Sequence, residues 1–334
     1  PRSVAGPRHG SAPRSIVRVG PPETVKQVGC EHRDKAMYDH IVIPVDGSDG
    51  ATTAARHGFA LAARFGASVS VLSVVARRAL RLTATDDERA RLRSNAEAIV
   101  DDVAALAPET VRPVATDVVD GAPATRITEY AADRDADLIA VGRQGTTGLG
   151  DRLLGGVTER VLHRSDTPVL VVPDSDADTG ATPAYSRILL PTDGSDSAGA
   201  AVPHGTAIAR AFGAAVHVLN VVDLQAEGGV FNAGGLEPAF VDRLERRGQD
   251  AVDAVASRIG TTAPDVTVDT AVERATPRGG VAAGVRDYAA TAGVDLLVMG
   301  ASGRSALNRQ LLGSVVSTVL RTVDVPVIAV PPTS

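Results

Sequence analysis

A pattern of three spaced glycines occurs twice in this sequence and constrains its fold more than any other feature. The second glycine follows the first by three positions and the third follows by ten; the residues are Gly142, Gly145 and Gly155, then Gly300, Gly303 and Gly313. Each copy begins directly after a short apolar segment, residues 137–141 and 295–299. Glycines between a strand and a helix let the backbone approach a phosphate, and the N-terminus of the following helix favours an anion. The pattern therefore predicts one nucleotide site in each half of the chain.

The residue after the third glycine differs between the two copies. Ser314 holds this position in the second copy, and Gly156 holds it in the first. A hydrogen bond to a charged group contributes about 1.5–3 kcal/mol, so the missing hydroxyl is expected to weaken phosphate binding about ten- to a hundredfold. Thr158 lies two residues further along, so its hydroxyl is not expected to reach the phosphate. A water molecule is the alternative replacement for the missing hydroxyl. The sequence thus predicts a stronger site in the second half.

Other segments repeat in the same order, which indicates two copies of one domain. Residues 41–49 (IVIPVDGSD) recur at 188–196 as ILLPTDGSD, and residues 68–75 recur at 215–222. The offset grows from 147 residues at these segments to 158 at the glycines, which leaves 11 extra residues in the second copy. The glycine-rich stretch 223–238 is the expected place for much of this excess, as a loop or lid.

Strand-like and helix-like segments alternate within each copy. In the first copy the expected strands are 39–45, 68–75, 112–118, 137–142 and 168–172. The expected helices are 50–65, 87–106, 123–133 and 156–164. This alternation predicts an α/β fold of two tandem, open, five-stranded parallel sheets with helices on both faces. With strand order 3-2-1-4-5, ligands bind where the order reverses, between the first and fourth strands of each copy.

The expected domain boundaries follow from composition. Residues 1–36 hold seven Lys or Arg against three acids and lack an apolar stretch, so we expect a disordered leader or an upstream extension before Met37, with a basic targeting arm as the alternative. The first domain is expected at 37–173 and the second at 186–331. Residues 174–185 are polar and unpatterned, which is typical of a linker.

Charge and composition exclude several function classes. The net charge of −6 argues against a nucleic-acid binder, and no apolar run reaches the roughly 20 residues of a membrane span. The single cysteine, Cys30, favours a reducing cytoplasm. Lysine is absent after Lys35, which excludes a Walker-type phosphate loop. The seven histidines show no metal-binding spacing, so we expect no protein-borne metal site and only Mg²⁺ that arrives with a nucleotide.

Residues 44–48 (PVDGS) and 191–195 (PTDGS), together with the doubled glycine pattern, resemble the universal stress protein family. The resemblance covers residues 37–331. Within the family, the chain is similar to a tandem member of the ATP-binding branch, which implies a Rossmann-like fold. It implies nucleoside contacts at Asp46 and Asp193, and backbone contacts to adenine at Val74 and Val221. It implies ribose and phosphate contacts at the glycines and Ser314. The full set of implied site residues is Pro44, Asp46, Val74, Gly142, Gly145 and Gly155, then Pro191, Asp193, Val221, Gly300, Gly303, Gly313 and Ser314.

For each of the singled-out residues, a structural role is the alternative to ligand binding. Ser48 and Ser195 precede helices and are natural N-caps, and the aspartates two residues before them can bond to loop backbone instead of a nucleoside. Arg143 and Arg304 lie in or beside the glycine loops, where we expect them to face solvent, with phosphate contact as the alternative. The matched pair His57 and His204 is expected to pack or to lie at the surface rather than to bind a ligand.

The leading hypothesis is a cytoplasmic stress protein whose bound ATP changes its stability or its choice of partner. It is not expected to be an enzyme, because no nucleophile elbow or dinucleotide fingerprint is present. One alternative is an interaction or dimerisation module that binds no nucleotide, and another is a weak ATP hydrolase. The last strands, near 168–172 and 326–330, are expected at sheet edges, where the two copies pair with each other or in a homodimer.

Overall fold

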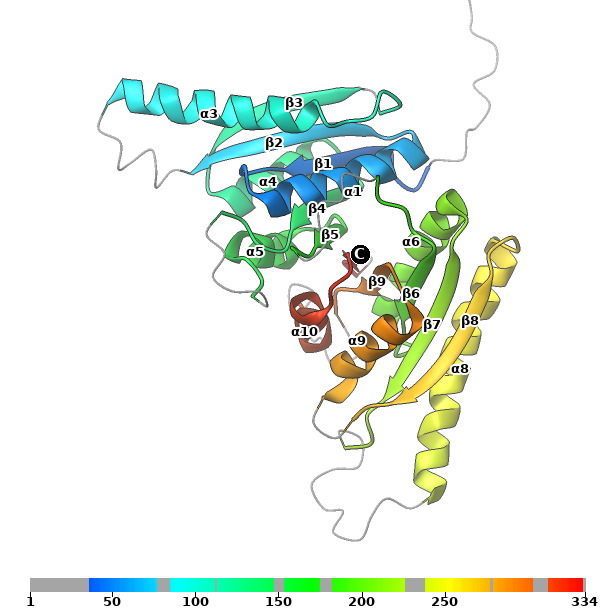
Figure 1. Cartoon of the computed structure of the whole chain (residues 1–334). Coiled ribbons are helices and arrows are strands. Elements are labelled where there is room, and N and C mark those ends of the chain that lie inside the picture. The colour runs from blue at the N-terminus through cyan, green and yellow to red at the C-terminus, as the bar shows by residue number, and fades with distance from the viewer. Residues whose placement is uncertain are drawn as a thin grey trace, which may run out of the picture. The chain divides into compact units, whose positions relative to one another are not determined.

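The computed structural model describes residues 36–76, 85–111, 113–146, 153–174, 182–225, 238–276, 279–302 and 312–332. In the first half, strands and helices alternate (Figure 1). The elements are β1 (His40–Pro44), α1 (Asp49–Phe65), β2 (Ser68–Ala76), α3 (Asp86–Ala104), β3 (Val114–Gly121), α4 (Pro123–Asp133), β4 (Leu138–Gly142), α5 (Gly156–Arg164) and β5 (Val169–Val172).

The second half repeats this order. Its elements are β6 (Arg187–Pro191), α6 (Asp196–Phe212), β7 (Ala215–Val222), α8 (Pro238–Thr262), β8 (Val268–Arg274), α9 (Gly280–Ala292), β9 (Leu296–Gly300), α10 (Ser314–Thr322) and β10 (Val327–Val330). Most of the glycine-rich stretch 223–238, expected as a loop or lid, lies outside the described residues.

Local sequence explains where the first helix of each half begins and ends. The hydroxyl of Ser48 accepts a hydrogen bond from the Ala51 N–H at the start of α1, and Ser195 caps α6 in the same way. Both helices end at a glycine with left-handed backbone, Gly66 with φ 69° and Gly213 with φ 70°, a conformation that side chains with a Cβ rarely adopt. The capping role predicted for both serines is confirmed.

The strand order confirms the predicted fold class. The sheet runs β3-β2-β1-β4-β5-β10-β9-β6-β7-β8, so each half has the order 3-2-1-4-5. The pairs within each half are parallel, while β5 and β10 pair antiparallel with Leu170 opposite Ile328. The order reverses between β1 and β4 and again between β6 and β9, which places a crevice at the carboxyl ends of these strands.

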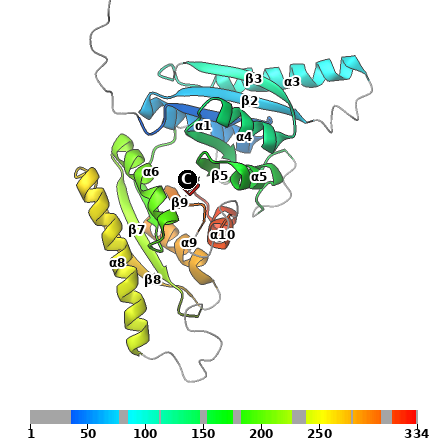
Figure 2. The same cartoon turned by 180° about the vertical axis from the view of Figure 1, so that it is seen from behind.

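Alternating side chains of the buried strands pack on opposite faces of the sheet. Ile41 and Ile43 join a core with α1 and α3, whereas Val42 joins a second core with α4 and α5. In β6, Leu189 likewise belongs to the core with α9 and α10, while its two neighbours pack against α6 and α8. Figures 1 and 2 show the two helix layers from opposite sides. Helices thus cover both faces of each half-sheet, as strands that are apolar at consecutive positions require.

The last residue of the predicted linker, Tyr185, is a buried aromatic residue. The sequence predicts residues 174–185 as a polar connection, yet Tyr185 is buried and its hydroxyl lies 2.8 Å from Nδ1 of His57. The segment therefore ends in a packed aromatic residue, because a tyrosine can bury its ring when its hydroxyl finds a partner. Of the two non-ligand positions expected for His57, packed or at the surface, the structure has the packed one.

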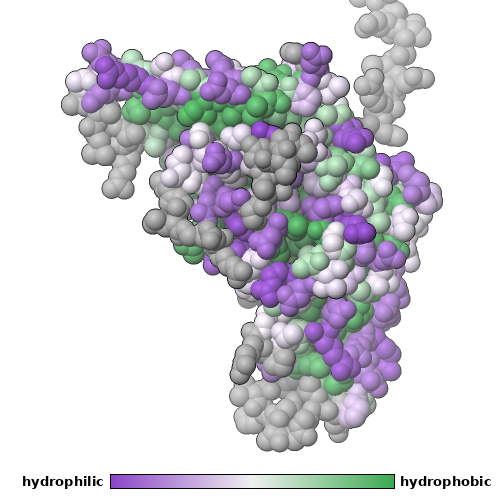
Figure 3. Space-filling model, viewed as in Figure 1, coloured by the Kyte–Doolittle hydropathy of each residue, from purple (hydrophilic) through white to green (hydrophobic). Residues whose placement is uncertain are grey.

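The surface is mixed in polarity. Figure 3 shows hydrophilic side chains over the outer surface of α3, whose buried residues are Ala96, Val100 and Val103. Among the described residues, no helix combines the length and the apolar character that crossing a membrane requires.

Candidate functional site

The turn after β6 is held by its own side chains. Thr192 Oγ1 accepts a hydrogen bond from the Gly194 N–H at 3.1 Å, and Asp193 Oδ1 accepts one from the Ser195 N–H at 2.9 Å. Gly194 adopts a φ of 78°, which places the turn in the left-handed region. The predicted alternative for Asp193, a bond to loop backbone, is therefore present. The carboxylate is half-buried at the carboxyl end of β6.

The backbone of Val221 faces the same place from the neighbouring strand. The pairing of β6 with β7 ends at Pro191 opposite Leu219, followed by a hydrogen bond from the Thr192 N–H to the Leu219 oxygen. Alternate residues of a strand direct their N–H and C=O groups to the same side. Val221, two residues beyond Leu219, therefore presents its backbone toward the space past the end of β6.

The glycines after β9 complete this region. A Cβ at Gly300 would lie 2.6 Å from the carbonyl carbon of Ser197, so only glycine permits this approach of β9 to α6. Gly313 donates its N–H to the Ala301 oxygen at 2.8 Å and precedes α10 without a side-chain cap. The first N–H groups of an α-helix have no partner within the helix and carry partial positive charge. Ser314, Val315 and Val316, the first residues of this helix, line a pocket.

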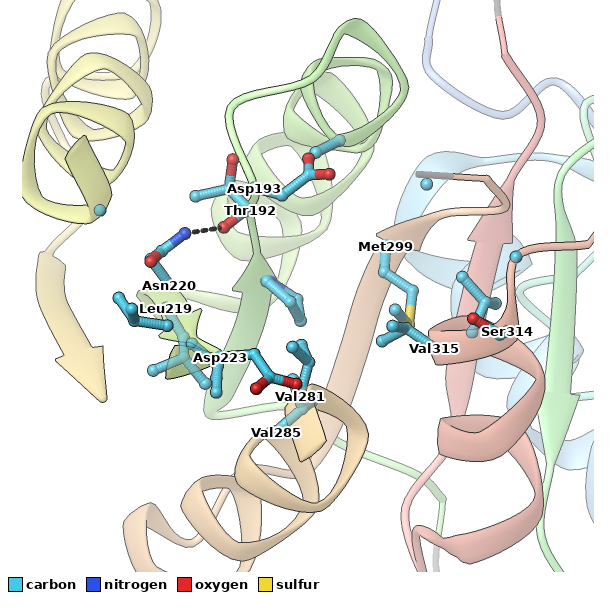
Figure 4. A pocket seen from close by; sticks show the side chains of 18 of the residues that line it. Thr192, Asp193, Leu219, Asn220, Asp223, Val281, Val285, Met299, Ser314 and Val315 are labelled. Atoms are coloured by element: carbon cyan, nitrogen blue, oxygen red, sulfur yellow. Dashed lines mark hydrogen bonds between the residues drawn. The ribbon is translucent and has the colours of Figure 1, made fainter. Parts of the chain in front are cut away.

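The pocket has a volume of about 470 Å³ and opens where β6, β7 and β9 end (Figure 4). Its lining includes every implied second-half residue except Gly303, which lies outside the described residues. These residues are Pro191, Asp193, Val221, Gly300, Gly313 and Ser314. Figure 4 places Asp193 above β6 and Ser314 at the start of α10, on different sides of the pocket. Residues more than 120 positions apart in the sequence thus meet at one site, at the predicted crevice.

Several lining residues were not predicted from the sequence. They are Thr192, Ala198, Leu219, Asn220, Val222, Asp223, Leu244, Arg247, Gly248, Val281, Val285, Met299, Ser302, Val315 and Val316. Most are apolar, which suits a planar ring, whereas Asp223 and Arg247 add opposite charges. A residue-by-residue comparison of the copies offers a signal for some of them, since Thr192 stands where the first half has Val45, and Asn220 where it has Ser73.

The corresponding region of the first half is arranged differently. Asp46 is exposed, and its Oδ1 accepts hydrogen bonds from the N–H and the hydroxyl of Ser48 at 3.1 and 2.6 Å. Its Oδ2 accepts one from the Thr146 N–H at 3.0 Å, and a Cβ at Gly145 would collide with this oxygen. Asp46 is therefore bonded to the glycine loop itself. Pro44 ends β1 and Val74 lies near the end of β2, as in the second half.

The remaining first-half residues surround the start of α5. Gly142 is buried at the end of β4, and Gly155 is the N-cap of α5, again without a side-chain cap. Thr158 is buried and donates its hydroxyl to the Gly142 oxygen at 2.9 Å, so this donor is engaged within the protein. Gly156 is exposed, and no hydroxyl stands at its position.

Arg143 corrects the expectation of a solvent-facing side chain. It is buried, and its Nη1 donates to the Val323 oxygen at 3.0 Å, with Nε 3.8 Å from Asp174. Its guanidinium packs into the fold instead of extending over a phosphate loop. Arg304, the other arginine beside a glycine loop, lies outside the described residues.

Comparison with known proteins decides the family. A sequence profile described as the Universal stress protein family matches twice, over residues 37–173 and 184–331. The chain belongs to the universal stress protein family. A universal stress protein of Methanocaldococcus jannaschii, MJ0531, is 37% identical over 145 residues, which cover 41% of this chain and 82% of the relative. YxiE, a universal stress protein of Bacillus subtilis, is 28% identical over 148 residues, with 41% of this chain and 99% of the relative covered.

A solved structure supports the fold over both halves of this universal stress protein. The crystal structure of a universal stress protein from Archaeoglobus fulgidus superimposes with a TM-score of 0.64 and 20% identity. The match covers 89% of this chain and 99% of that chain. At this identity the likeness concerns the fold alone. It covers both of the segments that match the family profile.

Proposed function

We propose that the second half of this universal stress protein binds an adenine nucleotide, with ATP as the expected ligand. One observation carries the proposal: a pocket of about 470 Å³ lies at the strand-order reversal and is lined by the implied second-half residues that the structure describes. Its volume is within the range of small-molecule sites, and ligands of open α/β sheets bind at this place.

The strand ends suit the nucleoside. The Val221 backbone offers one donor and one acceptor side by side at the edge of β7, a pair that matches the edge of an adenine ring. Asp193 is half-buried beside it and can accept a hydrogen bond from a ribose hydroxyl or the base. The apolar side chains of Val281, Val285 and Met299 supply a surface for the ring.

The start of α10 suits the phosphates. The lining there includes Ser314, Val315 and Val316 of the first helical turn, whose N–H groups have no partner within the helix, and Ser314 adds a hydroxyl. Together they form an anion cradle without lysine. No cluster of three metal-ligating side chains occurs among the described residues, so a Mg²⁺ ion would be held mainly through the phosphates, where it would offset the charges of Asp193 and Asp223.

The first-half site is proposed to be weaker. Gly156 supplies no hydroxyl at the start of α5, and Asp46 is already bonded to the Thr146 N–H. A nucleotide in this half would therefore lack one phosphate contact and compete with the loop for the carboxylate.

The two halves are proposed to act as domains, 37–173 and 186–331, joined by the linker 174–185 and paired through their last strands. The antiparallel ladder between β5 and β10 supports this pairing, and a homodimer formed through a different surface remains compatible with it. We propose that bound ATP serves stress response or regulation by changing the stability of the second domain or its choice of partner, rather than as the substrate of a dedicated enzyme.

A thermal-shift experiment on the full-length chain tests this function. ATP at about 100-fold above its dissociation constant is expected to add roughly 2.7 kcal/mol of stability, which appears as a higher Tm. ADP and AMP should give smaller shifts, and GTP separates adenine recognition from general phosphate binding. An unchanged Tm with all four nucleotides would overturn the proposal and favour an interaction module, whereas release of phosphate over time would favour a hydrolase.

A further inference from the structure

The side chain of Asn220 ties two strands together at the pocket. It lies on β7, is nine-tenths buried, and donates from Nδ2 to the Thr192 oxygen at 2.7 Å (Figure 4). A carbonyl can only accept, so this contact fixes the amide orientation and directs Oδ1 away from β6. Thr192 begins the turn that holds Asp193, which means that Asn220 fastens this turn to the neighbouring strand.

Gly248 on α8 provides the space that Asn220 occupies. A Cβ at this position would lie 2.5 Å from Asn220 Oδ1, closer than real contacts allow, and 3.1 Å from Val272 Cγ1, which is a tight contact. Gly248 lies within a helix, where glycine costs about 1 kcal/mol relative to alanine. Both residues line the pocket, so the glycine is explained by the asparagine beside it.

The first half carries the opposite combination. The Ala-Pro pairs after α3 and α8, at 107–108 and 263–264, place Gly248 156 residues after Leu92, and the strand repeat places Asn220 147 residues after Ser73. Leu92 packs against the apolar core. A serine hydroxyl is shorter than an asparagine amide, and the described hydrogen bonds include none from Ser73 to the turn after β1. The long polar side chain and the small helix residue have thus changed together.

We propose that Asn220, accommodated by Gly248, is a positioning residue for the nucleoside part of the second-half site. This inference rests on the proposed nucleotide function. Asn220 fixes the Thr192–Asp193 turn in the geometry that receives the nucleoside, whereas the first half carries Ser73 and Leu92 at the corresponding positions and has no described hydrogen bond from Ser73 to its turn. The pair therefore contributes to the difference in affinity between the halves, independently of Ser314.

The experiment compares adenosine, AMP and ATP binding by calorimetry with the full-length chain. Asn220→Ser is expected to weaken all three ligands by about tenfold, because the nucleoside end loses its fixed turn. Ser314→Ala serves as the matched control, since it should weaken ATP by about tenfold or more and leave adenosine unchanged. A role of Asn220 in stability alone would lower the Tm and leave the three dissociation constants at their wild-type values, which would overturn the inference.

Two further variants separate folding from binding. Gly248→Leu alone should lower the Tm, because leucine collides with Asn220 and Val272. Asn220→Ser combined with Gly248→Leu reproduces the first-half pair. This double variant should recover much of the Tm lost in Gly248→Leu, while its nucleoside affinity stays at least tenfold below that of the wild type. Wild-type affinity in this double variant contradicts the inference even if Asn220→Ser fails to fold. Absence of binding by the wild-type chain would instead remove the proposed function, and the inference with it.

Discussion

The hydroxyl of Tyr38 lies 2.9 Å from Nδ1 of His204, although 166 residues separate them. The same contact occurs a second time, since the hydroxyl of Tyr185 lies 2.8 Å from Nδ1 of His57. The two tyrosines lie 147 residues apart in the sequence, and so do the two histidines. Each tyrosine precedes the first strand of one half, and each histidine belongs to the first helix of the other half. The same contact is thus made twice, between equivalent positions of the two halves.

Acid is expected to destabilise the protein through His204. Burial lowers the pKa of His204 from 6.5 to about 4, while Asp137 acts in the opposite direction. The unfolded chain therefore binds the proton first, so the free energy of unfolding falls as the pH drops from about 6.5 to 4, by about 3 kcal/mol at most. Chemical denaturation at several pH values should show this loss, and His204→Gln should reduce it. Parallel curves for wild type and variant would contradict the account.

Removal of Arg143 tests a structural role against a phosphate-binding role. The guanidinium is buried and donates to the Val323 oxygen, so Arg143→Ala is expected to lower the free energy of unfolding by about 2–3 kcal/mol. Denaturant unfolding measures the loss. Arg89→Ala is the control, because its side chain is 57% exposed and should change stability by less than about 0.5 kcal/mol. Unchanged stability with weaker ATP binding would instead support the phosphate contact.

Glycine at the end of β9 is expected to be irreplaceable. Gly300→Ala places a Cβ 2.6 Å from the carbonyl carbon of Ser197, and overpacking of this kind costs about 1–3 kcal/mol. At Gly260, near the end of α8, no described atom outside the adjacent backbone of this helix lies within 4 Å of the added Cβ. Gly260→Ala should therefore stabilise the protein by up to about 1 kcal/mol. Equal effects of the two substitutions in thermal unfolding would argue against the close approach at Gly300.

A serine at position 156 is expected to strengthen the first-half site. The added Cβ meets only the end of the Arg160 side chain, at 3.2 Å, so the substitution should be tolerated. In the double variant Gly156→Ser, Ser314→Ala, the first-half site should bind ATP more tightly than the second-half site, by up to about tenfold. Calorimetry of the double variant measures this change. If the serine has no effect, the bond of Asp46 to Thr146 rather than the missing hydroxyl limits this half.

Local patterns predicted most of the fold. The helices expected at 123–133 and 156–164 have these same bounds, because Pro123 and Gly155 mark their starts and apolar periodicity marks their inner faces. The strand order followed from the alternation of strands and helices, which leaves few topologies. The position of the crevice followed from the glycine pattern, because the three glycines of each copy lie close together in the sequence.

The remaining features depend on residues far apart in sequence. Nothing near Arg143 indicates that Val323 will receive its guanidinium, and nothing near Tyr185 indicates His57. Asn220 and Gly248 are individually unremarkable, and only their contact explains them. Such contacts arise only when elements pack, so no local pattern in the sequence predicts them.

Calorimetric titration of the full-length chain with ATP tests the central claim most directly. The account predicts one tight equivalent of ATP per chain, with any second equivalent at least about tenfold weaker, and loss of the tight one in Ser314→Ala. Two equivalent sites, or a tight site that survives Ser314→Ala, would contradict it.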